Sequence, residues 1–205
     1  VNQFGEGTEI LGPNTIIVQK KVTESNIMGL TDTDFSEAQM KKIASEPFIT
    51  DVKPVIANNF DVYFKTNDKA VPPFGTDVFI QTVDPKFLKV DADLWQWKES
   101  DKSVPIVMPR DFLVMLNTFA SAQGIPQVSE SLAKKIKFRF ELKGEKGQEA
   151  LDAHIVGFTN EVSAILVPES FMEYGNVKYS DGEEINITQV MISGKESEFG
   201  LVEEY

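Results

Sequence analysis

The chain has 205 residues, of which 41% are hydrophobic and 25% are charged, a composition typical of a folded protein rather than a disordered one. Its formal net charge of −12 disfavours nucleic acid and anionic lipid as partners, because both attract clustered Lys and Arg side chains. It has no cysteine, which excludes disulfide scaffolds, thiolate metal sites and cysteine nucleophiles. No apolar run approaches the ~20 residues that a membrane-spanning helix needs.

The first third of the chain predicts a strand, a helix and two further strands. Residues 15–18 are a β-branched run that is typical of a buried strand. Ser36 is a plausible N-cap with Gln39 as its capping-box partner, and this helix is expected to end near Ser45. Residues 51–64 alternate between apolar and polar side chains toward their end, as a half-buried strand does, and a third strand is predicted over residues 77–83. This order of elements indicates an α+β fold.

A short pattern occurs twice in the second half of the chain. Residues 106–113 and 165–172 each contain three apolar residues, a proline, two mostly polar residues, a phenylalanine and another apolar residue. The pattern predicts a buried strand that turns into a helix, with Pro109 and Pro168 at the first helical position. Corners of this kind are active sites when they carry a nucleophile or a phosphate loop. Neither copy does, so both are interpreted as packing devices.

Between the two copies, the sequence predicts a β-hairpin. Residues 136–142 alternate between apolar and charged side chains, and residues 144–147 supply a glycine-rich turn. If Lys143 pairs with Gln148, apolar residues face apolar residues and charged residues face charged residues on both strands. That register sets Phe140 opposite Leu151, Phe138 opposite Ala153, Arg139 opposite Asp152 and Lys137 opposite His154. A short helix capped by Ser129 is expected before the hairpin, and a strand over residues 187–192 and the start of a helix over residues 196–205 are expected after it.

No catalytic constellation is recognised in the chain. His154 is the only histidine, and as a catalytic base it would need a nucleophile and an orienting acid. Because it is predicted to lie within a strand, on the polar face opposite Lys137, a structural role is favoured. Asp32 and Asp34 faintly resemble the start of a calcium loop, but Glu37 and Ile43 stand where that loop needs glycine and glutamate. The turn at residues 144–147 lacks the ending of a phosphate loop. We therefore predict no catalytic residue, no cofactor and no metal site.

Trp95 and Trp97 are the aromatic residues with a functional alternative. They stand among charged residues, where they could stack on a sugar or contact a partner protein, although packing in the core is the favoured interpretation. Lys137 and Arg139 lie on the polar face of the predicted hairpin. These four residues are the candidates for partner contact. Nothing in the spacing of the acidic residues supports a glycosidase with paired carboxylates.

Several short strings, in this order along the chain, resemble a known family. They are Phe35-Ser36-Glu37-Ala38-Gln39, Pro47-Phe48-Ile49, Asp51-Val52-Lys53-Pro54, Val104-Pro105-Ile106-Val107, Gln123-Gly124-Ile125-Pro126, His154-Ile155-Val156-Gly157-Phe158 and Leu166-Val167-Pro168. Over about residues 14 to 205, the chain resembles the MacB-like periplasmic core domain of FtsX-type ABC transporter permeases, especially those of Bacteroides-like bacteria.

The resemblance implies a non-catalytic domain at the periplasmic face of the bacterial inner membrane, placed between the first and second transmembrane helices of a permease. It implies an α+β fold with two lobes: a membrane-proximal α+β lobe formed by residues 1–90 and 183–205, and an inserted, mostly β lobe with short helices formed by residues 91–182. Such a domain transmits motion driven by a separate ATPase subunit, or contacts substrates and an outer partner protein or lipoprotein.

Two other classes of function stay open at this point. The first is a free-standing extracytoplasmic module that binds carbohydrate or protein through Trp95 and Trp97. The second, an acid/base hydrolase, is disfavoured. Membrane-spanning segments encoded on either side of this chain would favour the permease over the free-standing module.

Overall fold

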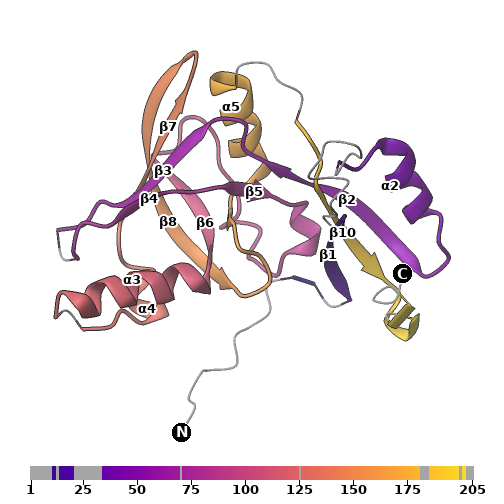
Figure 1. Ribbon diagram of the computed structural model, residues 1–205, viewed down its shortest axis with the longest axis horizontal. Coiled ribbons are helices and arrows are strands. Elements are labelled where there is room, and N and C mark those ends of the chain that lie inside the picture. The colour runs from indigo at the N-terminus through magenta and orange to yellow at the C-terminus, as the bar shows by residue number, and fades with distance from the viewer. Residues whose placement is uncertain are drawn as a thin grey trace, which may run out of the picture.

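The computed structural model describes residues 11–12, 14–20, 34–69, 71–124, 126–180, 185–198 and 200–201 (Figure 1). Its elements in chain order are β1 (Thr15–Gln19), α2 (Glu37–Ala44), β2 (Ile49–Ala57), β3 (Asp61–Thr66), β4 (Gly75–Asp77), β5 (Ile80–Thr82), the 3-10 turn η1 (Pro85–Phe87), β6 (Ser103–Pro109), α3 (Arg110–Ala122), α4 (Glu130–Ala133), β7 (Phe138–Gly144), β8 (Gly147–Thr159), β9 (Ile165–Leu166), α5 (Glu169–Tyr179), β10 (Gln189–Gly194) and the 3-10 turn η2 (Glu196–Glu198). The predicted α+β class is confirmed.

The strands are hydrogen-bonded in the order β1-β10-β2-β5-β9-β6-β8-β7-β3-β4. Only Val78 and Phe79 separate β4 from β5, and the Val78 N–H donates to the Val62 carbonyl at 2.9 Å. The last strand in this order, β4, therefore continues along the chain into β5, which stands in the middle of the order. As a result, the strands β5, β9, β6, β8, β7, β3 and β4 form a closed ring. We call this closed part the barrel, and we call β1, β10 and β2 with α2 the terminal sheet.

The barrel encloses the largest hydrophobic core of the described chain. Phe64, Phe138 and Phe140 point into it and are at most 1% exposed. The rings of Phe64 and Phe138 stack with centroids 4.9 Å apart, and Phe140 lies 5.3 Å from Phe64. The alternation of apolar and polar residues that predicted half-buried strands thus separates the inside of the barrel from its outside.

Helices close the two ends of the barrel (Figure 1). At the start of β3, Phe60 contacts Tyr179 of α5 with ring centroids 5.8 Å apart. Beyond the other end of β3, Phe74 contacts Phe119 of α3 at 5.9 Å. The two repeated corners therefore deliver one helix to each end of the barrel.

The helices at the two repeated corners begin one residue later than predicted. Pro109 and Pro168 are the N-cap residues of α3 and α5, and not their first helical residues. Their ψ angles of 137° and 146° are extended, so each proline still belongs to the strand side of the corner and the helix begins at the next residue. Both helices lack a side-chain cap, in contrast to α2.

The terminal sheet is smaller and more open. Its strands β1 and β2 both pair antiparallel with β10, so the first and last strands of the described chain lie side by side. Phe35, Ile49, Val190 and Ile192 form its separate buried cluster. The predicted capping box of α2 is confirmed: Gln39 N–H donates to Ser36 Oγ at 3.3 Å, and Ser36 N–H donates to Gln39 Oε1 at 3.0 Å.

Most of the hairpin register is confirmed. Lys143 pairs with Gln148, Phe140 with Leu151 and Arg139 with Asp152. The last expected pair, Lys137 with His154, does not form, because the pairing of β7 with β8 ends at Phe138 and Ala153. On its other side, His154 lies opposite Pro105 of β6. The Lys137 carbonyl instead accepts a hydrogen bond from the Asn67 N–H at 2.7 Å.

The remaining predicted elements differ at their ends. The short helix α4 is capped by Ser129 as expected, and the last strand is Gln189–Gly194 rather than residues 187–192. The strand predicted over residues 77–83 is divided into β4 and β5. Of the helix expected over residues 196–205, η2 and residues 200–201 are helical, and residues 199 and 202–205 lie outside the described part of the chain.

Candidate interaction surface

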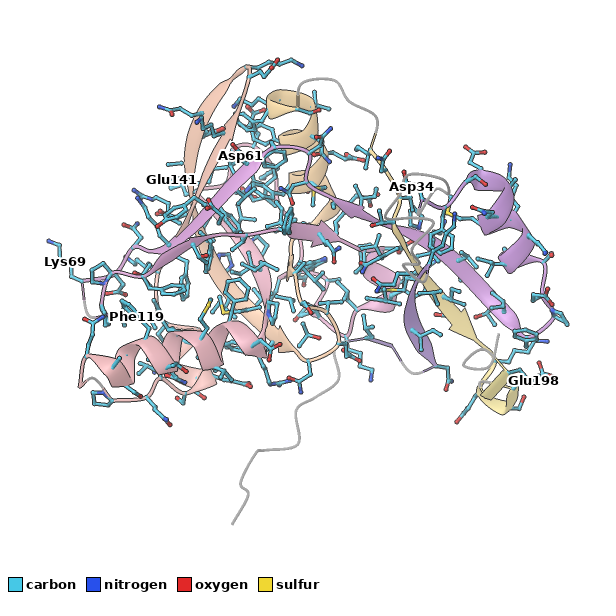
Figure 2. The ribbon with its side chains drawn as sticks, in the orientation of Figure 1. Asp34, Asp61, Lys69, Phe119, Glu141 and Glu198 are labelled. Carbon is cyan, nitrogen blue, oxygen red and sulfur yellow. The ribbon has the colours of Figure 1, made fainter. Side chains whose placement is uncertain are left out.

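The outer face of the barrel over β4, β3, β7 and β8 carries the side chains that alternate with the core residues. Three rows of side chains cross these strands, as fixed by the strand registers. They are Phe79, Asp61, Lys143 and Gln148 in the first row, Asp77, Tyr63, Glu141 and Ala150 in the second, and Gly75, Lys65, Arg139 and Asp152 in the third. The position of Phe79 opposite Asp61 follows from the neighbouring Tyr63–Asp77 pair and the Val78–Val62 hydrogen bond. We call these twelve residues the outer grid; Asp61 and Glu141 mark it in Figure 2.

Charge pairing is uneven across the outer grid. In the third row, Arg139 donates two hydrogen bonds to Asp152 Oδ1, at 2.7 and 2.9 Å, and Lys65 forms an ion pair with Glu141 of the second row. Asp61 and Asp77 stand at the other end of the grid, and neither carboxylate belongs to an ion pair found among the described residues. The grid therefore has a neutralised half and an acidic half.

Tyr63 lies across β4 because Gly75 leaves room for its ring. A Cβ atom on Gly75 would come within 2.5 Å of the Tyr63 hydroxyl and 2.8 Å of its ring carbons. The ring is 38% exposed, so one face of it contacts the sheet while part of its surface faces outward. Phe79, two residues beyond Asp77, is 77% exposed.

Two shallow hollows flank these aromatic side chains. One, of about 690 Å³, is lined by Tyr63, Asp61, Asp77 and residues of β7 and β8. The other, of about 540 Å³, is lined by Phe79, Asp61, Lys143 and the end of α5. Exposed aromatic side chains beside a concave, charged surface are typical of protein contact surfaces rather than of enclosed reaction sites.

The predicted contact residues are distributed between the core and this surface. Trp95 and Trp97 are buried, at 5% and 6% exposure, in two different hydrophobic clusters. Trp97 packs edge-on against Phe171 with centroids 5.0 Å apart, which is the packing interpretation favoured for it. Arg139 lies on the outer grid, and Lys137 is exposed just before β7. Sequence reasoning missed Tyr63, Asp77 and Phe79, although their alternation with buried residues was the signal that could have identified them.

A cluster of polar side chains connects the β7–β8 hairpin to α5. Glu149 of β8 accepts hydrogen bonds from Tyr174 Oη at 2.6 Å, from Lys178 Nζ at 3.0 Å and from Tyr179 Oη. Burial alone would raise the pKa of Glu149, but the hydrogen bonds from both tyrosines and from Lys178 hold this pKa below its ordinary value. Burial and the hydrogen bond to Glu149 raise the pKa of Tyr179. These hydrogen bonds join β8 to α5 at the end of the barrel.

His154 has a local partner as well. Its Nδ1 lies 2.8 Å from Ser103 Oγ on the neighbouring strand β6. Within the described residues, no group of three or more His, Cys, Asp or Glu side chains could hold a metal ion, and Asp32 lies outside them. No helix in the described ranges is long and apolar enough to cross a membrane.

Comparisons with known proteins identify the family. The periplasmic region of MacB from Actinobacillus actinomycetemcomitans is 12% identical with a TM-score of 0.43, and the match covers 95% of this chain and 80% of that one. The extracellular domain of the noncanonic ABC-type transporter YknZ from Gram-positive bacteria is 12% identical with a TM-score of 0.39, covering 92% and 88%. No curated protein matches the sequence. The family model described as "probable transporter periplasmic core domain" matches residues 16–205, so the chain belongs to this family of periplasmic transporter domains.

Proposed function

We propose that this chain is the non-catalytic extracytoplasmic domain of an ABC transporter permease of the MacB or FtsX type. In this role it couples motion, driven by a separate ATPase subunit and relayed by the transmembrane helices of the permease, to contacts with a substrate or partner protein outside the inner membrane. Family membership supports the transporter context. The coupling role rests on how the terminal sheet is joined to the barrel.

The observation that carries the proposal is the path of β2. Its residues up to Val55 pair with β10 in the terminal sheet, and Ile56 and Ala57 pair with β5 of the barrel. The first and last strands, β1 and β10, pair with each other in the same terminal sheet. A displacement applied where the chain enters and leaves this sheet would therefore reach the barrel through one continuous, hydrogen-bonded strand.

We propose the terminal sheet as the membrane-proximal part and the barrel as the outer part. The division of the chain into residues 1–90 with 183–205 and residues 91–182 stays a proposal of the same kind. Strands β3 and β4, which precede residue 90, pair within the barrel, and a separation of the two parts along the strand pairings would fall near β2.

A free-standing carbohydrate module that uses Trp95 and Trp97 is not favoured by any observation. Stacking on a sugar needs an exposed ring face, and both indoles are buried. An enzymatic role has no supporting grouping of side chains on the outer grid. The proposal therefore assigns contact, and not chemistry, to the outer surface of the barrel.

The experiment that tests coupling restrains the barrel against the terminal sheet. Gln81 of β5 donates a side-chain hydrogen bond to Gln189 of β10 at 3.0 Å, across β2. These 205 residues contain no cysteine, so in a full transporter whose other cysteines have been replaced, the Q81C/Q189C pair can be joined selectively by a short bismaleimide after reconstitution with the ATPase subunit. We expect the cross-link to reduce ATP hydrolysis by the transporter.

Two controls separate restraint from modification. Single Q81C and Q189C variants treated with N-ethylmaleimide should keep full ATP hydrolysis. A cross-link within the terminal sheet, at Thr15 and Ser193, whose hydroxyl oxygens are 2.9 Å apart, should also leave it intact. Unchanged hydrolysis in cross-linked Q81C/Q189C would contradict the coupling role, and a coding sequence without membrane-spanning segments beside this domain would contradict the permease.

A further inference from the structure

On the acidic half of the outer grid, aromatic and carboxylate side chains alternate on two neighbouring strands. Tyr63 lies opposite Asp77, and Phe79 lies opposite Asp61 at the next outward-facing position. Each ring thus has a carboxylate across from it and another two residues away along its own strand. We propose that this square of four residues, the acidic square, binds an arginine side chain presented by a basic segment of a partner protein.

The ring of Tyr63 supplies a flat surface. Gly75 allows the ring to lie across β4, because any larger residue there would overlap the tyrosine hydroxyl and ring edge. A guanidinium group is planar and weakly hydrated, so it stacks on an exposed aromatic ring better than a lysine ammonium group does. The geometry therefore favours arginine over lysine at this position.

The carboxylates supply the charge. The nearby cations Lys65 and Arg139 already have anionic partners in Glu141 and Asp152. Lys143 faces Asp61 in the strand register but forms no ion pair within the described part of the chain. Asp77 has no cation opposite it, since its neighbour across the strands is Tyr63. A guanidinium group stacked on the Tyr63 ring, which lies over Gly75, would have the unpaired Asp77 carboxylate at the next outward-facing position of β4. A carboxylate is the group with which arginine forms two parallel hydrogen bonds.

The exposure of Phe79 indicates that the occupant is a protein segment and not free arginine. At 77% exposure, this phenylalanine leaves most of its ring in water on the charged face of a sheet. A partner that covers it gains apolar burial next to the arginine contact, and the hollows of about 690 and 540 Å³ on either side leave room for neighbouring side chains. The net charge of −12 attracts a basic segment from a distance.

This inference rests on the proposed function insofar as the outer surface of the barrel is the partner-contact surface. Its test uses the 205-residue chain alone. The probe is an acetylated, amidated peptide of glycine and serine with two central arginines, titrated into isotope-labelled protein while backbone amide shifts are recorded. We expect saturable shifts centred on β3 and β4, weaker shifts with the lysine version of the peptide, and none with the citrulline version, which has the same shape without charge.

Variants separate this site from general attraction to an acidic protein. Asp77→Asn should weaken binding about tenfold, the loss of one charge-assisted contact. Glu196→Gln is the matched control, because it removes one charge from an exposed position of the terminal sheet region and should leave binding unchanged. Tyr63→Leu should weaken binding, whereas Tyr63→Phe should keep it.

Equal affinity for Asp77→Asn and Glu196→Gln, or shifts spread over the whole surface, would overturn the acidic square as a binding site. Equal binding of the arginine and lysine peptides would overturn the stacking on Tyr63. Neither result would touch the coupling proposal, which is tested by the Q81C/Q189C cross-link in the complete transporter. Conversely, the peptide titration gives its answer whether or not the cross-link reduces ATP hydrolysis.

Discussion

The barrel and the terminal sheet share strand β2 but differ in how completely their elements are buried. The barrel closes on itself around fully buried phenylalanines, with helices at both ends. In the terminal sheet, α2 has no buried residue, whereas Val55 and Met191 of its strands are buried in a cluster that they share with barrel residues such as Leu166. Parts of a protein that bury little apolar surface open at lower free energy than a closed core does. The difference indicates that α2 opens at a lower free energy than the closed barrel does.

The largest expected effect compares the two cores directly. Phe140→Ala removes a ring that contacts Phe64 and Phe171, so we expect the free energy of unfolding to fall by about 3–5 kcal/mol. Met40→Ala in α2, which removes a half-buried side chain of the terminal sheet, should cost about 1 kcal/mol. Hydrogen exchange of the amides of β7 and of α2 in increasing urea measures the two losses separately. Similar losses in unfolding free energy for the two variants would contradict the difference in packing between the barrel and the terminal sheet.

The next effect concerns the attachment of the hairpin to α5. A Cβ atom on Gly144 would lie 1.9 Å from the Tyr179 carbonyl oxygen, so Gly144→Ala must push the hairpin tip away from the helix. We expect a loss of about 2 kcal/mol in thermal or urea unfolding, typical of overpacking. Gly12→Ala is the control, because its added Cβ would meet no atom closer than 3.6 Å. A Gly144→Ala variant as stable as the parent would show that the hairpin tip can move away from α5 at no cost in unfolding free energy.

A pH-dependent effect at the same junction comes from Glu149. Its folded pKa is held below the ordinary value of 4.5, so the stability that its ionised form contributes is present above that value and is lost as the pH falls through the folded pKa. Glu149→Gln should therefore be less stable than the parent at pH 7, and this difference should shrink as the solution is acidified. A difference in unfolding midpoint that stays constant from pH 7 to pH 3 would contradict the stabilised carboxylate.

Local patterns predicted the parts of this fold that are decided locally. The register of the β7–β8 hairpin followed from matching both faces across a short turn, and the cap of α2 followed from Ser36 and Gln39. The family, inferred from short strings in order, is confirmed by the family match. Closure of the barrel was not predicted, because it depends on β3 pairing with β7 across more than seventy residues, and no local pattern encodes such a contact.

The candidate surface was predicted only in part for the same reason. Arg139 was placed on it by the hairpin register, but Tyr63, Asp77 and Phe79 become neighbours only when β4 pairs with β3. Trp95 and Trp97 drew attention through their charged sequence neighbours, whereas the burial of Trp97 depends on Phe171 and that of Trp95 on a cluster that includes Met191, both distant in sequence. Sequence neighbours describe a residue's own strand, and a surface is made by several strands.

The smallest expected effect is also the sharpest test of whether the terminal sheet opens by itself. Ser36→Ala removes a cap that accepts the Gln39 N–H and should cost about 1 kcal/mol of helix stability. If the domain unfolds as one unit, that loss lowers the protection of barrel amides against hydrogen exchange as much as that of α2 amides, because both exchange through global unfolding. If the terminal sheet opens separately, protection falls in α2 and stays unchanged in β7 and β8. We expect the second pattern, since α2 buries no residue of its own and its Met40 and Ile43 are only partly buried against the cluster of Phe35, Ile49, Val190 and Ile192. Equal loss in both regions would mean that β2 ties the two parts into a single cooperative unit.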